Sequence, residues 1–180
     1  MPTENIIGHT RKRDYRSQRL RLIKRRFLPA IWLALIVMAP CSSAFGQNIT
    51  VNNNLVFGNI FPGIPKTVSK RIAGAAAEFL ISGTAGLELT IDLTLPTFMN
   101  DVGNNMQLVF TETDAALDSS ATPDQSNPSL DNIDPWHTIT YRLGSNGITL
   151  WLGGMAIPKL NQVAGSYSAV IVMTVVYTGN

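Results

Sequence analysis

The amino-acid sequence predicts an all-β protein: a two-sheet β-sandwich of the immunoglobulin-like kind, preceded by a signal helix. Three observations lead to this prediction. Short segments of alternating apolar residues, separated by Gly, Pro and Asn turns, recur from residue 47 to the end of the chain, which is typical of sandwich strands. No stretch after residue 46 has sustained helical periodicity. Residues 1–46 have the charge and hydropathy pattern of an export signal.

The first 46 residues predict a signal peptide. Nine of the 14 Lys and Arg residues lie in a long basic n-region, 1–26, and an uninterrupted apolar h-region follows at 27–39. These 13 apolar residues are too few to span a bilayer, which takes about 20, and they suit a signal h-region. Small residues place cleavage after Gly46, with cleavage after Ala44 as the alternative. We therefore expect an exported protein, in the periplasm, at the cell surface or extracellular, with no stable membrane span after cleavage.

Removal of the signal reverses the charge of the chain. Residues 47–180 contain five basic and ten acidic residues, so their formal net charge is −5. A basic surface that would bind nucleic acid is therefore not expected. The single cysteine, Cys41, falls within the signal. Residues 47–180 are expected to form a single β-sandwich domain without a disulfide, because roughly 130 residues can bury a sufficient core.

The last apolar segment, residues 167–177, organises the predicted fold. Every second residue from Tyr167 to Tyr177 is apolar, and the opposite register also becomes apolar after Ser168. Alternation that is rich in Val, Ile, Thr and Tyr predicts a β-strand. Because both of its faces are largely apolar, we expect a central strand that is covered on both sides.

About seven further strands are expected before this last one. They lie at 49–57, 65–72, 77–81, 87–95, 106–110, 136–143 and 148–152. The second is short and carries Lys66, Lys70 and Arg71, which is typical of an edge strand, because charged side chains discourage pairing with other chains. The turn residues at 145–147 predict a hairpin between the last two of these strands, and the two glycines at 153–154 predict a bend.

A long polar loop, 112–135, interrupts the strands. Loops of this length are uncommon in compact domains and are usually functional or disordered. Its aspartates do not have the spacing of an EF-hand, so we expect a solvated flexible loop, with contact to calcium or another ligand as the alternative. Trp136 and Trp151 could stack on a sugar if they were exposed together, but packing in the core or at its rim is expected. The aspartates of this loop are Asp114, Asp118, Asp124, Asp131 and Asp134.

No catalytic centre is recognisable in the sequence. His137 is the one histidine outside the signal, and a histidine-based metal site needs several ligands. The Gly-x-Ser-x-Gly pattern of a nucleophile elbow does not occur. We therefore expect that the protein is not an enzyme and has no catalytic residue, metal ion or cofactor.

Four fragments of the sequence resemble a family of bacterial secreted domains that is catalogued as a domain of unknown function, the 4402 type. The fragments lie at 57–63, 77–83, 152–154 and 164–168, and the last runs on to 174–177. They occur in this order and together extend over nearly the whole predicted mature chain.

That family is in turn similar to chaperone–usher pilin subunits. In those subunits a periplasmic chaperone recognises a C-terminal strand with a Gly and a near-terminal Tyr, and the next subunit's N-terminal extension completes an open sandwich. The resemblance implies that Gly165, Tyr167 and Tyr177 belong to the strand that the chaperone contacts. It also implies that Ile49 and Val51 are apolar plugs of a donor strand, and that the partners are a periplasmic chaperone and other pilin-like subunits.

The expected function is therefore that of a secreted, structural, pilin-like subunit of a bacterial surface appendage. Because the segment before residue 54 is short, two arrangements stay open. Either residues 49–57 are themselves the donor strand and the domain begins after them, or the protein is self-complete or terminal in a fibre. The alternative function is a monomeric extracellular binding or adhesion module that uses the 112–135 loop.

Overall fold

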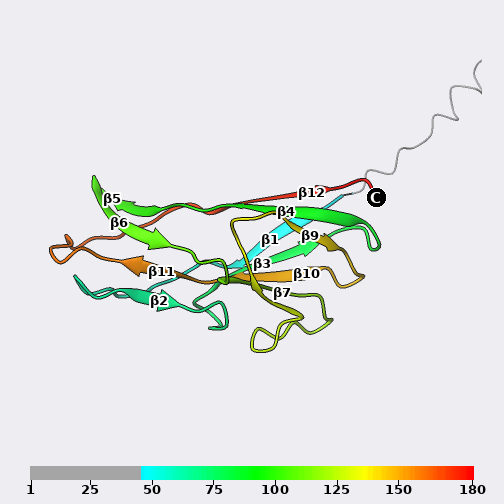
Figure 1. Cartoon of the computed structure of the whole chain (residues 1–180), viewed down its shortest axis with the longest axis horizontal. Coiled ribbons are helices and arrows are strands. Elements are labelled where there is room, and N and C mark those ends of the chain that lie inside the picture. The colour runs from blue at the N-terminus through cyan, green and yellow to red at the C-terminus, as the bar shows by residue number, and fades with distance from the viewer. Residues whose placement is uncertain (1–45) are drawn as a thin grey trace, which may run out of the picture. The chain divides into compact units, whose positions relative to one another are not determined.

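A computed structural model describes residues 46–180, which belong to one compact unit. Apart from Gly46, the predicted signal peptide lies outside the described residues. Within them the chain forms twelve β-strands and no helix (Figure 1), which confirms the all-β prediction. The strands are β1 (Asn48–Asn53), β2 (Lys66–Val68), β3 (Ala77–Ser82), β4 (Glu88–Thr94), β5 (Phe98–Asp101), β6 (Asn104–Val109), β7 (Ala115–Asp118), β8 (Leu130–Ile133), β9 (Ile139–Arg142), β10 (Ile148–Leu152), β11 (Gly154–Ile157) and β12 (Val172–Tyr177).

The strands form three antiparallel sheets. Sheet A has the order β1-β3-β10-β7-β8, sheet B the order β2-β11-β6-β5, and sheet C the order β12-β4-β9. Only Gly153 separates β10 from β11, and three residues separate β4 from β5. Sheet B therefore extends both of the other sheets, and its strands lie together at the end of the domain farther from the C-terminus (Figure 1). This arrangement is consistent with a β-sandwich.

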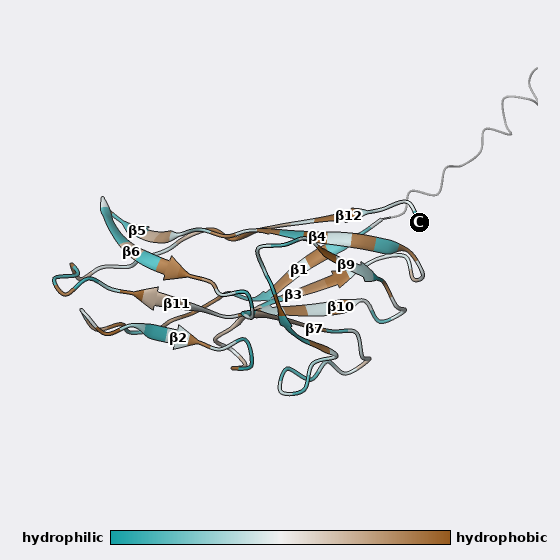
Figure 2. Cartoon of the chain, in the orientation of Figure 1, coloured by the Kyte–Doolittle hydropathy of each residue, from teal (hydrophilic) through white to brown (hydrophobic). Residues whose placement is uncertain are grey.

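The core lies between the inward faces of the sheets. The alternation predicted for β3 and β4 is confirmed, because Phe79, Ile81, Leu89 and Ile91 are buried and belong to one continuous apolar cluster. Hydrophobic and hydrophilic bands alternate along β4 in Figure 2. All five residues of β10 are buried, since this strand is covered on both faces. Complete burial of a large apolar side chain stabilises a fold by about 1.5–3 kcal/mol.

The predicted edge strand and the predicted bend are both confirmed. β2 lies at the edge of sheet B. Gly153 sits where the chain leaves sheet A for sheet B, and its N–H donates to the Asp114 carbonyl at 2.8 Å. A Cβ atom at this position would lie 2.5 Å from the Val68 carbonyl oxygen and 2.6 Å from the Lys70 nitrogen. The crossing therefore requires glycine, because backbone atoms cannot easily move aside.

The predicted hairpin at 145–147 is wrong, although a turn forms there. The N–H of Gly147, which has a φ of 74°, donates to the Gly144 carbonyl at 3.3 Å. However, β9 pairs with β4, whereas β10 pairs with β3 and β7. The turn therefore carries the chain from sheet C to sheet A. The turn residues alone do not distinguish a hairpin within one sheet from a connection between two sheets.

The structure has more strands than the approximately eight that the sequence predicted. The additional ones are short, and two of them, β7 and β8, lie inside the segment that was predicted to be a long loop. All four residues of β7 are buried, although two are alanines and one is an aspartate. This composition is poor in the β-branched and aromatic residues that indicate a strand, so tertiary packing decides the conformation.

The last strand is not central. Among the described strands, β12 lies at the edge of sheet C and pairs only with β4. Its inward register is confirmed, since Val175 is buried and Met173 and Tyr177 pack against the core. Its outward residues Val172 and Val176 are 49% and 51% exposed. The apolar outer face that suggested a covered strand is therefore largely open to solvent.

Candidate functional site

A groove lies between the first strand and the C-terminal segment. Two adjoining cavities of about 760 and 450 Å³ share the lining residues Leu55, Phe57, Met99 and Tyr167. One wall comes from segment 51–62 and the other from segment 162–171. Among the described residues, no Asp, Glu, Lys, Arg or His lines either cavity. In this part of the chain the groove is therefore uncharged, and most of its lining residues are apolar.

The first wall begins with β1, which is an edge strand. In the antiparallel pairing with β3, Ile49 lies opposite Ile81 and Val51 lies opposite Phe79. Directly opposed residues project to the same face of a sheet, so Ile49 and Val51 share the inward face with two buried residues. Ile49 packs against the core, whereas Val51 is 55% exposed. An inward-facing valine that stays exposed marks a place where the opposite layer does not cover β1.

The second wall is the edge of the C-terminal segment. Ser168 exchanges backbone hydrogen bonds with Asn100, at 2.9 and 3.1 Å, and the Thr178 N–H donates to the Glu88 carbonyl at 3.0 Å. Because N–H and C=O groups alternate sides along a strand, the even-numbered residues point toward β5 and β4. The odd-numbered residues on either side of Ser168 and within β12 therefore direct their backbone groups away from β5 and β4. Ala169 is exposed although it belongs to the inward register.

One end of the groove is closed by contacts between the two walls. The Gln47 side-chain amide donates to the Val175 carbonyl. The Tyr177 hydroxyl accepts a hydrogen bond from the Thr84 N–H at 2.7 Å and lies 3.4 Å from the Gly46 carbonyl oxygen. β1 and β12 therefore meet near the C-terminus and separate away from it (Figure 1).

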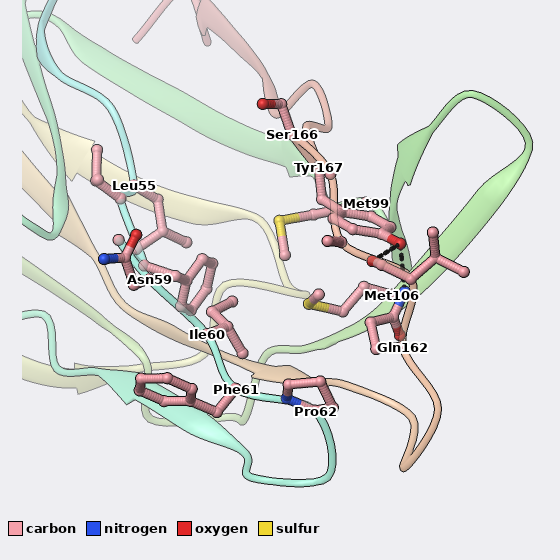
Figure 3. Close-up of a pocket in the computed structure, with 16 residues that line it drawn as sticks. Leu55, Asn59, Ile60, Phe61, Pro62, Met99, Met106, Gln162, Ser166 and Tyr167 are labelled. Atoms are coloured by element: carbon pink, nitrogen blue, oxygen red, sulfur yellow. Dashed lines mark hydrogen bonds between the residues drawn. The ribbon is translucent and has the colours of Figure 1, made fainter.

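The other end of the groove is wide and contains methionine. Met99 of β5 and Met106 of β6 are paired neighbours in sheet B, and both are buried. Figure 3 shows their side chains pointing across the cavity toward the segment that carries Ile60. Flexible thioether side chains adapt to partners of different shape. This end can therefore accept a bulky apolar group.

Hydrogen bonds fix the aromatic ring at the wide end of the groove. The Tyr167 hydroxyl donates to the Val163 carbonyl at 2.8 Å and accepts from the Gln162 side chain at 2.6 Å. The backbone of Gly165 passes close to β5, because a Cβ atom there would lie 1.9 Å from Asp101 Oδ2. The connector that leads into the last strand is thus held against the end of the β5–β6 hairpin.

All five residues that the resemblance singled out lie in or beside the two walls. Val51 and Tyr167 line the groove, as does Gly165, while Ile49 is built into β1 and Tyr177 closes the end. Sequence reasoning missed Phe57 and Met99 as site residues. Phe57 lies in a fragment that carries the family resemblance, whereas Met99 gave no signal, because β5 was not predicted.

The segment 112–135 is held in place by Asp118, whose side chain is buried. Its carboxylate accepts hydrogen bonds from the Ser120 N–H at 3.0 Å and the Asp124 N–H at 2.8 Å, and from the Ser129 hydroxyl. Burial opposes ionisation of Asp118, but the bonds from Ser129, Asp124 and Ser120 together outweigh it and lower the pKa to about 2.

A second anchor of the same segment is Lys70, which is 8% exposed. Its ammonium donates to the Thr113 carbonyl and to Asn132 Oδ1 at 2.9 Å, and pairs with Asp131 at 2.8 Å. The hydrogen bond from Lys70 lowers the pKa of Asp131 to about 2 against the effect of burial, and Arg71 adds to this effect. Segment 112–135 is therefore tied to the chain that follows β2.

The two tryptophans do not form a common surface. Trp151 is 2% exposed, whereas Trp136 is 48% exposed and donates its indole N–H to the Phe110 carbonyl at 2.9 Å. The neighbouring His137 pairs with Asp134 at 2.7 Å. The hydrogen bond from the backbone N–H of Trp136, with a smaller contribution from His137, lowers the pKa of Asp134. A sugar platform built from both tryptophans is therefore excluded.

Within residues 46–180, neither a metal site nor a membrane-spanning helix is present. Among residues 46–180, no group of three or more His, Cys, Asp and Glu side chains could hold a metal ion. In the same range, no helix is long and apolar enough to cross a membrane. Neither a protein-family model nor a curated protein matches the sequence.

Proposed function

We propose that this protein is an exported, pilin-like structural subunit of a bacterial surface appendage, and that its groove accepts a β-strand from another subunit. The proposed fold is an immunoglobulin-like sandwich that lacks one edge strand beside β12. Sheet orders β1-β3-β10-β7 and β12-β4-β9 support this assignment, since two such layers with one strand missing leave a groove between their first and last strands. The resemblance of the sequence to pilin-like domains agrees with it.

The observation that carries the proposal is the exposure of inward-facing residues on both walls. Val51 and Ala169 belong to inward registers, yet neither is covered. The exposed side chains of Val56, Phe61 and Val163 also line the groove. Monomeric proteins rarely expose continuous apolar surface of this kind without an interaction partner.

The backbone of the groove favours a strand over a globular ligand. The odd-numbered residues beside Ser168 and within β12 direct their backbone groups away from the partner strands, and β1 is an edge strand among the described residues. Unpaired strand edges are templates for another chain. An added strand gains main-chain hydrogen bonds, and its alternate side chains fill pockets. Such a strand would cover the apolar inward residues and pair both edges at once.

The proposal is tested on cells that express the protein. We expect electron microscopy to show surface fibres that disappear when the gene is deleted and return when the wild-type gene is restored. A Val51→Lys variant should restore few or no fibres, because a charge would enter an uncharged groove. Val51 is half-exposed, so the variant should still fold.

The matched control is Val176→Lys, at a valine that is 51% exposed on the outer face of β12 and does not line the groove. This variant should restore the fibres. The proposal is wrong if the deletion leaves the fibres unchanged and the purified protein has no strand-binding activity.

A further inference from the structure

We infer that this chain accepts a strand from a different protein and does not donate its own first strand to a second copy. The inference rests on the proposed function and names the partner of the same groove. It concerns the direction of exchange: a subunit that both accepts and donates forms open chains of identical copies, whereas a subunit that only accepts ends such a chain.

β1 is an integral strand of its own domain. Four consecutive residues from Asn48 to Val51 pair with β3, and Asn53 pairs with Glu78. Ile49 packs against the core, opposite Ile81, which is completely buried. Donation of β1 would break this pairing and expose Ile81. An edge strand that contributes to the core is a poor donor, because its removal destabilises the protein that donates it.

The start of β1 is also attached to the opposite wall of the groove. The Gln47 amide donates to the Val175 carbonyl. With the predicted cleavage after Gly46, Gln47 is the one residue before the first paired residue, Asn48.

The sequence that precedes β1 lacks the pattern of a donor strand. Residues 11–26 contain nine Lys and Arg, and residues 27–39 are continuously apolar. A strand that covers one face of a groove needs alternation with a period of two, which neither stretch has. The groove offers no acidic side chain to pair with the arginines. The occupant that fits is a free extended segment of another protein.

The chemistry of that segment follows from the groove. The accessible edge runs from Tyr167 to Met173, because the Val175 carbonyl is already bonded. An extended segment of about seven residues covers this length. Its alternate side chains must be apolar and uncharged to lie on Val51, Phe57 and Met99.

The test uses the protein purified from the exported fraction, with three synthetic peptides as probes. One is a nine-residue peptide of alternating Val and Thr, and the second has the same composition in the order Val-Val-Thr-Thr. The third has the sequence of residues 47–57 of this chain. Analytical ultracentrifugation gives the oligomeric state, and thermal unfolding gives binding, because a ligand of the folded state raises the melting temperature.

We expect a monomer at every concentration. The alternating peptide should raise the melting temperature, and the other two peptides should not. Val51→Lys should weaken binding of the alternating peptide by about tenfold or more, whereas Val176→Lys should leave it unchanged.

Concentration-dependent oligomers, or binding of the 47–57 peptide as strong as that of the alternating peptide, would overturn this inference and leave the proposed function standing. A monomer that binds none of the peptides would remove the proposed function and this inference with it.

Discussion

At the scale of single residues, Lys70 shows how one buried charge can order a long polar segment. Its ammonium has three oxygen partners, from Thr113, Asn132 and Asp131. A buried ammonium is costly unless it is paired and hydrogen-bonded. Here the partners belong to the segment that contains β7 and β8, so the charge and the segment stabilise each other.

Lys70→Met should therefore destabilise the protein by about 2–4 kcal/mol, because the Thr113 carbonyl and the Asn132 side chain lose their donor and Asp131 loses one of its two cationic partners. Chemical unfolding in urea measures this change. Lys66→Met is the control, since the Lys66 ammonium bonds an exposed carbonyl of Asn59 at 3.2 Å, and it should change stability by about 0.5 kcal/mol or less. Equal effects of the two substitutions would contradict the role of Lys70.

The lowered pKa values of Asp118 and Asp131 predict how stability depends on pH. Both pKa values are about 2 in the folded protein, below the value of about 3.9 for an unfolded chain. The stabilisation from these carboxylates is therefore fully present above about pH 4, and it is lost as the pH falls from about 4 to about 2.

This pH dependence is measured as the free energy of unfolding between pH 5 and pH 2. Wild-type stability should fall steeply below about pH 4, and Asp118→Asn should have a shallower slope because one of the two groups no longer titrates. Identical slopes for the two proteins would show that Asp118 is not responsible.

At the scale of the strand, the end of β12 depends on a glycine in another strand's turn. A Cβ atom on Gly83 would lie 2.1 Å from the Tyr177 hydroxyl and 3.2 Å from a Leu143 methyl group. The hydroxyl accepts from the Thr84 N–H. The absence of a side chain at position 83 thus leaves room for the ring that closes the groove.

Gly83→Ala should displace Tyr177 and destabilise the protein by about 1–3 kcal/mol. Hydrogen exchange of the β12 amides should become faster. Gly144→Ala is the matched control, because a Cβ atom there meets nothing within 4 Å. If both variants exchange their β12 amides at the wild-type rate, the proposed clash at Gly83 does not occur.

The strands that the sequence predicted are those in which the apolar pattern of the strand's own residues is sufficient to indicate a strand. Alternation in β3, β4, β6 and β10 places large apolar residues inward, and no competing pattern is present. β7 is different, because its four residues are buried where it pairs with β10, a strand distant in sequence. A local pattern cannot report burial that other parts of the chain impose.

The candidate site was predictable only in part for a related reason. The alternation of residues 167–177 gave the inward register correctly. It did not show that the segment lies at an edge, because an apolar outer face is compatible with either place. Val51 is exposed because no described strand packs over it. The sequence around Val51 has the same pattern whether or not such a strand is present, so it could not predict this exposure.

At the scale of the whole molecule, the groove and the charge distribution fit together. Residues 47–180 have a formal net charge of −5, while the groove is uncharged. The net negative charge therefore favours solubility of residues 47–180, and it does not repel an apolar strand from the groove. An occupied groove would pair both free edges and remove a surface that is prone to unwanted association.

The contact between Gln47 and Val175 has a consequence for biosynthesis. These residues are separated by 128 positions. The contact between the start of β1 and β12 can therefore form only after nearly the whole chain has been synthesised. Such distant closure is slow and comes late, and a nascent or truncated polypeptide remains a substrate for proteases in the meantime. Loss of even the final ten residues should therefore yield degraded fragments instead of a shortened, folded product.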